Sequence, residues 1–157
     1  MRFKSAMWVW LLTMLMLPSW SANARAEQVS GTGTSTITNI VVVSSRNAGG
    51  NNILTLEVTA ALTGVLEGTL LSQETAIVHP NGTVTLQAVS TFNGTANGAE
   101  GTLILRENGV IDASGQLRHS NFVILDAGGG LSGVRGRGSL QLVGGAGSYE
   151  VDLQFPD

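Results

Sequence analysis

The sequence of 157 residues contains no cysteine. It therefore cannot form disulfide bonds, and it lacks the residue that carries the lipid anchor of a bacterial lipoprotein. Aromatic residues are also few, since the chain beyond residue 26 has no tryptophan and keeps only Phe92, Phe122, Tyr149 and Phe155. Four aromatic side chains cannot form the two girdles of an outer-membrane barrel, so this class of β-protein is disfavoured.

Positive charge is scarce as well. The only lysine, Lys4, lies near the start, and the chain beyond residue 26 holds five arginines against eleven acidic residues, a formal charge of −6. An acidic chain without lysine is a poor binder of nucleic acids and of anionic membranes. We therefore expect no nucleic-acid partner.

Long hydrophobic runs are absent except near the start. Arg2 and Lys4 precede an apolar run over residues 6–17, and the small-residue site Ala24-Arg25-Ala26 follows. This order is typical of a secretory signal peptide, and the run is shorter than the roughly 18–20 residues that cross a bilayer. We predict a signal peptide over residues 1–26, a single domain over 27–157, and a secreted or periplasmic protein without a stable membrane span. A retained membrane anchor is the weaker alternative.

The remaining chain has no apolar stripe with the 3.6-residue period of a helix, and apolar and polar residues alternate instead. After a polar lead at 27–35, this pattern predicts eight strands, at residues 36–45, 53–62, 69–79, 83–93, 102–107, 116–125, 134–143 and 148–155. Glycine-rich and asparagine-rich separators, including Asn108-Gly109, stand between them. Short sequential strands joined by turns predict an all-β fold, an antiparallel eight-stranded closed barrel, because closure removes exposed edges.

The clearest local prediction is a hairpin around the turn His79-Pro80-Asn81-Gly82, with Gly68 and Gly94 at its far ends. If this turn sets the register, Glu74 lies on the inner face of the barrel. The other residues expected to line the lumen and bind a ligand are Val78, Leu86, Ala88, Ser90, Phe92 and Arg118. Leu71 and Ile77 on the opposite face predict that the lead segment or another subunit covers this strand from outside.

Several short motifs follow one another in an order and spacing that resemble a known family. They are Gly64-Val65-Leu66-Glu67-Gly68, His79-Pro80-Asn81-Gly82-Thr83, Phe92-Asn93-Gly94-Thr95, Gly98-Ala99-Glu100-Gly101-Thr102-Leu103, Gly109 and the glycine-rich run 129–138. Over residues 62–155 the chain resembles an uncharacterised bacterial domain family whose barrel is similar to those of allene oxide cyclases and dirigent proteins.

The resemblance implies a small antiparallel barrel. Relatives of this architecture hold a reactive apolar substrate in the lumen and steer its cyclisation or coupling largely by shape. Such domains carry a tyrosine where this chain has Glu74 and Val78, and a glutamate where it has Ser90. A shared fold therefore does not imply that this chain has the activity of those relatives.

An enzyme of this kind needs an ionisable or hydrogen-bonding group in its lumen. We predict Glu74, Tyr149 and Arg106 as candidate catalytic residues, because a carboxyl group in an apolar lumen has a raised pKa suited to general acid–base catalysis. The alternative for Glu74 is a position in solvent or in a pair with an arginine.

No metal site and no cofactor are expected. The only histidines, His79 and His119, lie far apart in the sequence, and no acidic cluster has metal-ligand spacing. The run 128–133 matches the glycine pattern of dinucleotide-binding proteins, but the residues after it cannot form the required helix.

Three functions remain open. The first is the binding of a small apolar ligand in the lumen, and the second is a cofactor-independent isomerase or cyclase acting on such a ligand. The third is a packed structural module without a cavity, which associates with other copies of itself through its outer faces. The first two require an open lumen, and the second also requires a reactive group inside it.

Overall fold

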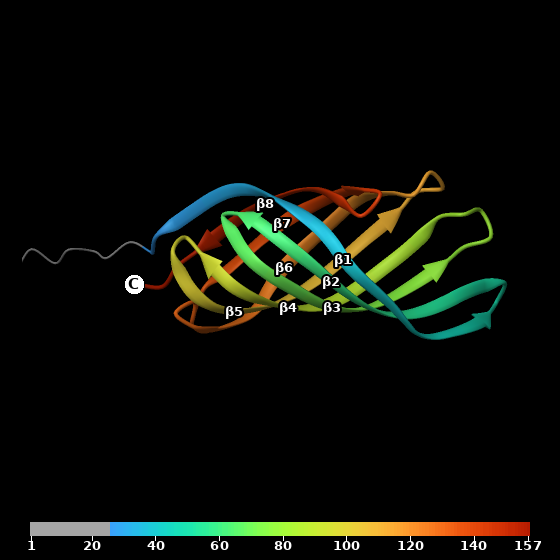
Figure 1. The fold of residues 1–157 in the computed structure, drawn as a ribbon, viewed down its shortest axis with the longest axis horizontal. Helices are drawn as coiled ribbons and strands as arrows, with labels where there is room; N and C mark the ends of the chain where they lie inside the picture. The colour runs from blue at the N-terminus through green and yellow to red at the C-terminus, as the bar shows by residue number, and fades with distance from the viewer. Residues whose placement is uncertain (1–25) are drawn as a thin grey trace, which may run out of the picture.

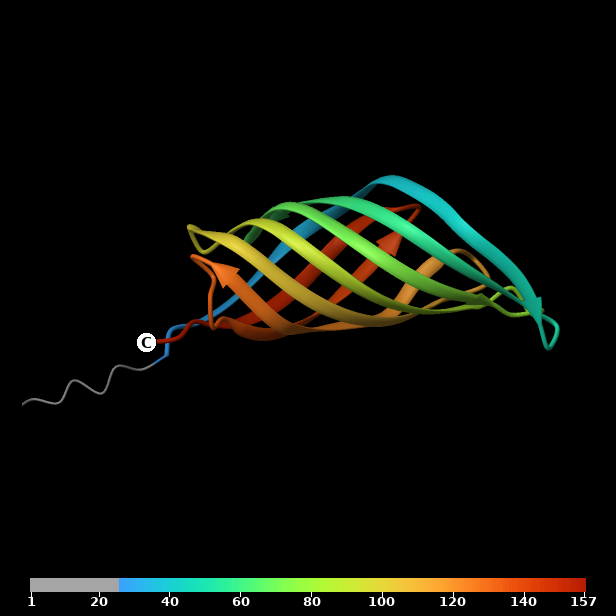
Figure 2. The same cartoon turned by 90° about the horizontal axis from the view of Figure 1, so that it is seen from below.

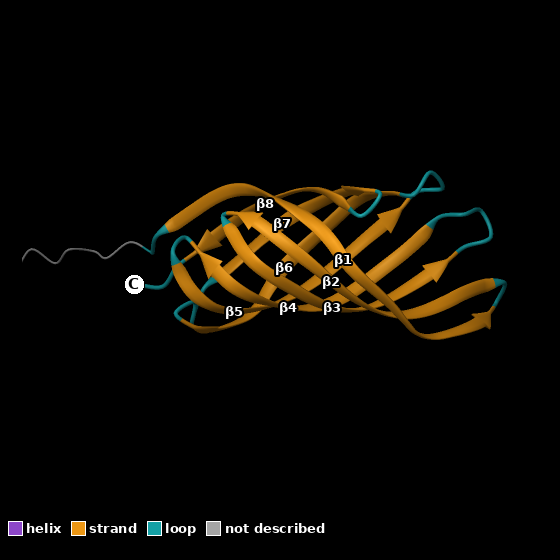
Figure 3. Ribbon diagram, viewed as in Figure 1, coloured by secondary structure: helices purple, strands orange, loops and turns teal. Residues whose placement is uncertain are grey.

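The computed structural model describes residues 26–157, apart from the side chain of His119. The described chain forms eight strands: β1 (Gln28–Ala48), β2 (Asn51–Gly64), β3 (Leu66–Val78), β4 (Val84–Ala96), β5 (Ala99–Ile111), β6 (Gln116–Gly129), β7 (Arg135–Val143) and β8 (Ala146–Gln154). Each strand pairs antiparallel with its neighbours in sequence, and β8 pairs with β1, so that the sheet closes (Figure 1, Figure 3). The predicted all-β, eight-stranded closed barrel is confirmed. No helix in the described range is long and apolar enough to cross a membrane.

Several strands extend beyond the predicted limits. The polar lead forms the first part of β1, where residues 28–36 pair with β8 and close the barrel. It therefore does not cover the outer face of β3, where Leu71 is exposed. The prediction of a separator at Asn108-Gly109 is wrong, because both residues lie within β5 and the chain turns at residues 112–115 instead. In these two stretches, backbone hydrogen bonds to the neighbouring strands maintain the strand, although apolar and polar side chains alternate little there.

The hairpin of β3 and β4 has the predicted turn. The Gly82 N–H donates to the His79 carbonyl oxygen at 2.9 Å, and Gly82 has a φ of 83°, in the left-handed region that favours glycine. The register places Glu74 opposite Ala88. Gly68 and Gly94 pair with each other inside the strands, so they do not mark the strand ends as predicted.

One half of the barrel is filled with side chains. Its core consists of Leu62, Leu66, Phe92, Ala96, Leu103, Leu105, Phe122, Leu131, Val134, Tyr149, Val151 and Leu153. Leu131 and Val134 come from the loop between β6 and β7, which closes this end of the barrel. The start of β1 and the C-terminus lie at the same end (Figure 2). We call this the packed half, and the half toward the β3–β4 turn the open half.

Candidate functional site

The open half contains a cavity of about 280 Å³. Its lining is mainly aliphatic, and it includes the predicted lumen residues Val78 and Leu86 together with Leu54, Leu56, Val58, Ala60, Ala76, Leu140 and Leu142. The lining side chains with a polar or ionisable group are Glu74, Glu107, Ser35 and Ser72. The cavity is therefore an apolar chamber with two carboxyl groups in its wall.

A larger hollow, of about 590 Å³, lies outside the barrel along β1, β6, β7 and β8. Its wall contains exposed polar residues such as Arg137 and Asp152, and the hydroxyl of Ser30 already donates to Asp152 Oδ1 at 2.6 Å. Water reaches these groups freely, so they offer a ligand little gain from desolvation. We therefore take the lumen as the candidate site.

Glu74 is positioned by the alternation of β3. It lies between Leu56 on β2 and Ala88 on β4 in the strand register, and its side chain lines the cavity. Burial, together with the nearby Glu107 carboxyl, raises the pKa of Glu74 to about 7. Among the described residues no side chain hydrogen-bonds to this carboxyl. Glu74 can thus accept a hydrogen bond when ionised or donate one when protonated, in either case to a bound molecule.

Glu107 is a second carboxyl group in the lumen, and it was not among the predicted site residues. It lies on β5 in register with Ala88, so that this small side chain alone stands between the two glutamates along the row. Burial raises the pKa of Glu107, although a hydrogen bond from the Ser120 hydroxyl opposes the shift. The signal for it was present in the sequence, because Glu107 has the same parity as the inward residues Leu103 and Leu105.

A layer that contains buried serine side chains lies where the open half meets the packed half. Ser72 and Ser90 face each other across β3 and β4, with their hydroxyl oxygens 2.7 Å apart, and both are buried. The prediction placed Ser90 and Phe92 in the ligand-binding lumen. In the structure both are fully buried, and they line a smaller space of only about 30 Å³ next to the main cavity.

Tyr149 lies in the packed half, where its hydroxyl fixes the turn between β2 and β3. It accepts a hydrogen bond from the Leu66 N–H at 2.8 Å, and the carbonyl oxygens of Thr63 and Leu66 lie 2.9 and 3.0 Å away as acceptors. Gly33 makes room for the ring, because a Cβ there would lie 2.3 Å from the Tyr149 hydroxyl oxygen. Burial raises the pKa of Tyr149, which keeps the hydroxyl protonated. These contacts give Tyr149 a structural role.

Arg106 is exposed on the outer face of β5, in register with Val89 and Val123. The prediction of Arg106 as a candidate catalytic group in the lumen is therefore corrected. The period of two residues that turns Leu105 and Glu107 inward turns Arg106 outward.

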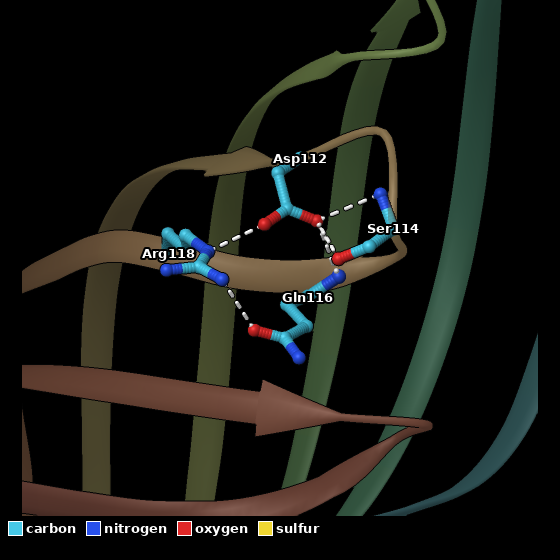
Figure 4. Close-up of polar contacts among 4 residues, drawn as sticks. All are labelled: Asp112, Ser114, Gln116 and Arg118. Atoms are coloured by element: carbon cyan, nitrogen blue, oxygen red, sulfur yellow. Dashed lines mark hydrogen bonds and ion pairs between the residues drawn. The ribbon is translucent and has the colours of Figure 1, made fainter.

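Arg118 was predicted to line the lumen, and the structure corrects this position too. Its side chain is 57% exposed, forms an ion pair with Asp112 and donates from Nη2 to Gln116 Oε1 at 2.7 Å (Figure 4). Asp112 also accepts from the hydroxyl and the amide of Ser114. The hydroxyl of Ser114, followed by the Gln116 amide, holds the pKa of Asp112 well below its usual range. This network belongs to the β5–β6 turn.

The described residues include no group of three or more histidine, cysteine, aspartate or glutamate side chains that could hold a metal ion. Among the described residues, the ionisable groups that line the lumen are two carboxyl groups in apolar surroundings. Such groups can bind a polar part of a ligand or transfer a proton.

The comparisons with known proteins place this barrel among uncharacterised relatives. The family model DUF3224, described as a protein of unknown function, matches residues 29–155. A solved structure of a protein of unknown function from the DUF3224 family of Shewanella oneidensis MR-1 has a TM-score of 0.65 and 21% sequence identity. The match covers 83% of this chain and 99% of that chain. At this identity the likeness shows the fold alone. The search of curated proteins gave no match.

Proposed function

Given that this chain belongs to DUF3224, a family of unknown function, we propose that it binds a small, mainly apolar molecule in the open half of its barrel. The family resemblance in residues 62–155 is thereby confirmed and extends to residue 29. The observation that carries the proposal is the unequal filling of the lumen. One half is packed, whereas the other keeps a cavity of about 280 Å³ between aliphatic walls.

The size of the cavity and its lining define the ligand. The volume lies just below the range of about 300–1,000 Å³ that is usual for ligand sites, which favours a small molecule. The aliphatic walls favour an apolar body, because its burial removes apolar surface from water. Glu74 favours one hydrogen-bonding group on that body. The packed alternative, a barrel with no cavity, does not account for the open half.

The neutral fluorescent probe N-phenyl-1-naphthylamine tests this proposal. It is apolar, carries one N–H donor, and gains fluorescence in apolar surroundings, and the protein beyond residue 26 has no tryptophan to interfere. We expect binding by the wild type and its loss in Ala76→Phe, which fills the lumen. Ala61→Phe is the matched control, because Ala61 is exposed on β2 whereas Ala76 lines the cavity. Equal binding by all three proteins, each checked for folding by circular dichroism, would exclude the lumen as the site.

A second candidate function is proton transfer on the bound molecule, as in an isomerase or cyclase that uses no cofactor. The observation that favours it is the Glu74 pKa of about 7, because a general acid or base works best when its pKa lies near the working pH. Small molecules that co-purify with the protein from its host, detected by native mass spectrometry, supply the substrate for the test. Incubated with the protein in D₂O, they should incorporate deuterium at carbon with the wild type and not with Glu74→Gln. Equal incorporation with both would remove Glu74 from the mechanism.

Binding in the periplasm or outside the cell is part of this proposal. The predicted signal peptide over residues 1–26 supports it. We expect the protein recovered from the periplasm or the medium to begin at Glu27, as read by mass spectrometry of its N-terminal peptide. Recovery of the chain in the cytoplasm with residues 1–26 attached would contradict export.

A further inference from the structure

β1 is the longest strand, and only its first part is paired along both edges. Residues 28–36 pair with β8, and the Ile37 N–H donates to the Gly145 carbonyl oxygen at 2.7 Å. From Thr38 to Ala48, β1 pairs with β2 alone, and no other described strand lies along its second edge. Figure 1 and Figure 2 both show the β1–β2 hairpin reaching well past the shorter β7–β8 turn.

The free edge carries an unusual sequence for an exposed strand. Residues 38–44 read Thr-Asn-Ile-Val-Val-Val-Ser, with neither a charge nor a proline. Ile40, Val41, Val42 and Val43 are 45–58% exposed. Natural proteins protect free edges with lysine, proline, bulges or short strands, and an exposed apolar edge is a template for another strand. Two bulges flank residues 39–42, but those four residues pair regularly with β2.

The hairpin that presents this edge is anchored on its other side. The His79 ring, at the start of the β3–β4 turn, contacts Asn51 Oδ1 through Nδ1 at 3.0 Å and Thr85 Oγ1 through Nε2 at 3.0 Å. β2 also pairs with β3 up to Asn52. The free edge is therefore presented by a supported hairpin, which lowers the ordering cost of pairing with another strand.

We propose that this free edge pairs antiparallel with the same edge of a second copy of the chain, about a twofold axis near Val41 and Val42. An antiparallel edge is self-complementary, so one segment satisfies both sides of an isologous interface. Arg46 is the only charged residue between Gln28 and Leu56, and antiparallel pairing places the two copies of Arg46 at opposite ends of the ladder. No like charges then meet at the centre.

Pairing also extends both apolar faces of the segment. Val41 lies opposite Glu57, on the outer face of the sheet, whereas Ile40 and Val42 lie opposite Val58 and Leu56, on the face that lines the lumen. A second copy of the strand would continue each face with the same apolar side chains, so that neighbouring side chains shield one another from water. The proposal concerns subunit association, so its test is independent of the test for ligand binding.

Sedimentation velocity of the protein from residue 27 onward tests the association. We expect a dimer for the wild type and a monomer for the double variant Val41→Lys/Val43→Lys, which brings like charges together at the interface. Leu71→Lys is the matched control, because Leu71 is 51% exposed on a strand that is paired along both edges. This control should remain a dimer. A monomeric wild type, or a dimer that persists in the double variant, would overturn the proposal.

Cross-linking tests the orientation and does not depend on the folding of the lysine variant. The chain has no native cysteine, so each variant carries one thiol. We expect Val41→Cys or Val42→Cys to form an intermolecular disulfide on mild oxidation. Asn47→Cys should not, since antiparallel pairing separates its two copies by more than about 30 Å. A cross-link at residue 47 would indicate parallel pairing, and no cross-link at either 41 or 42 would exclude pairing about this axis; either result overturns the proposal.

Discussion

Glu74 links the stability of the protein to pH. The group has a folded-state pKa of about 7 against a reference value of 4.5, so the folded protein holds this proton more tightly than the unfolded chain does. The resulting stabilisation is complete below about pH 4.5 and is lost as the pH rises toward 7. It amounts to at most about 3 kcal/mol. Glu107, whose pKa is raised by burial, acts in the same direction.

We therefore expect the wild type to be more stable to urea at pH 5 than at pH 8. Glu74→Gln should lose much of this difference, because its amide does not ionise. Glu57→Gln, an exposed glutamate on β2, is the control and should keep the wild-type dependence. If Glu74→Gln and the wild type show the same change in the free energy of unfolding between the two pH values, Glu74 is not held in the apolar lumen.

Tyr149 allows a structural role to be separated from a catalytic one. Tyr149→Phe leaves the Leu66 N–H without its acceptor in a buried position, which should cost about 1–3 kcal/mol of unfolding free energy. The loss should appear in urea unfolding, whereas the dissociation constant for N-phenyl-1-naphthylamine should stay close to that of the wild type. Weaker probe binding with unchanged stability would place the hydroxyl in the ligand site instead.

At the scale of the strands and turns, Asp112 organises the connection between β5 and β6. Its carboxylate accepts from the amides of Ser114 and Gln116 as well as from Arg118. We expect Asp112→Ala to speed the hydrogen exchange of these two amides, and Arg118→Ala to do so less, because it removes only one of the contacts. The increase should be confined to the turn. Faster exchange throughout β5 and β6 would show that the turn holds the whole hairpin.

The sequence predicted the parts of the barrel in which side-chain pattern and turn chemistry agree. The β3–β4 hairpin is such a case, and its register placed Glu74 on the inner face. Prediction failed where the strands continue, through backbone hydrogen bonds, beyond the segments in which apolar and polar side chains alternate. Residues 30–36 of β1 are all glycine, serine or threonine, and β5 continues through Asn108 and Gly109. The true turn carried a recognisable signal, the aspartate of Asp112-Ala113-Ser114-Gly115.

The candidate site was predicted only in part. The errors concern the face of the strand on which a side chain lies and the half of the barrel in which it lies. Strand parity is enough to place Glu107 on the inner face with Leu103 and Leu105, and to place Arg106 on the outer face. Tyr149 does lie on the inner face, with Val151 and Leu153 of the same strand. The sequence alone could not show that the Tyr149 hydroxyl binds the β2–β3 turn in the packed half, in the space that Gly33 leaves. These contacts join residues from distant parts of the chain.

At the scale of the whole molecule, we expect the packed half of the barrel to contribute most of the stability and the open half to bind the ligand. Leu103 is fully buried in the packed half, whereas Leu86 lines the cavity of the open half. Leu103→Ala leaves a new void among packed side chains and should cost about 3–5 kcal/mol. Leu86→Ala adds to space that already exists and should cost about 2–3 kcal/mol. Urea unfolding of both variants measures this difference.

The same pair of variants should affect ligand binding in the opposite order. Leu86→Ala enlarges the chamber beside Glu74, so we expect it to bind bulkier naphthylamine derivatives than the wild type accepts. Leu103→Ala lies on the far side of the Ser72–Ser90 layer and should leave the size limit unchanged. A size limit that shifts with Leu103→Ala and not with Leu86→Ala would place the binding space in the packed half. Such a result would contradict the division of the barrel on which the proposed function depends.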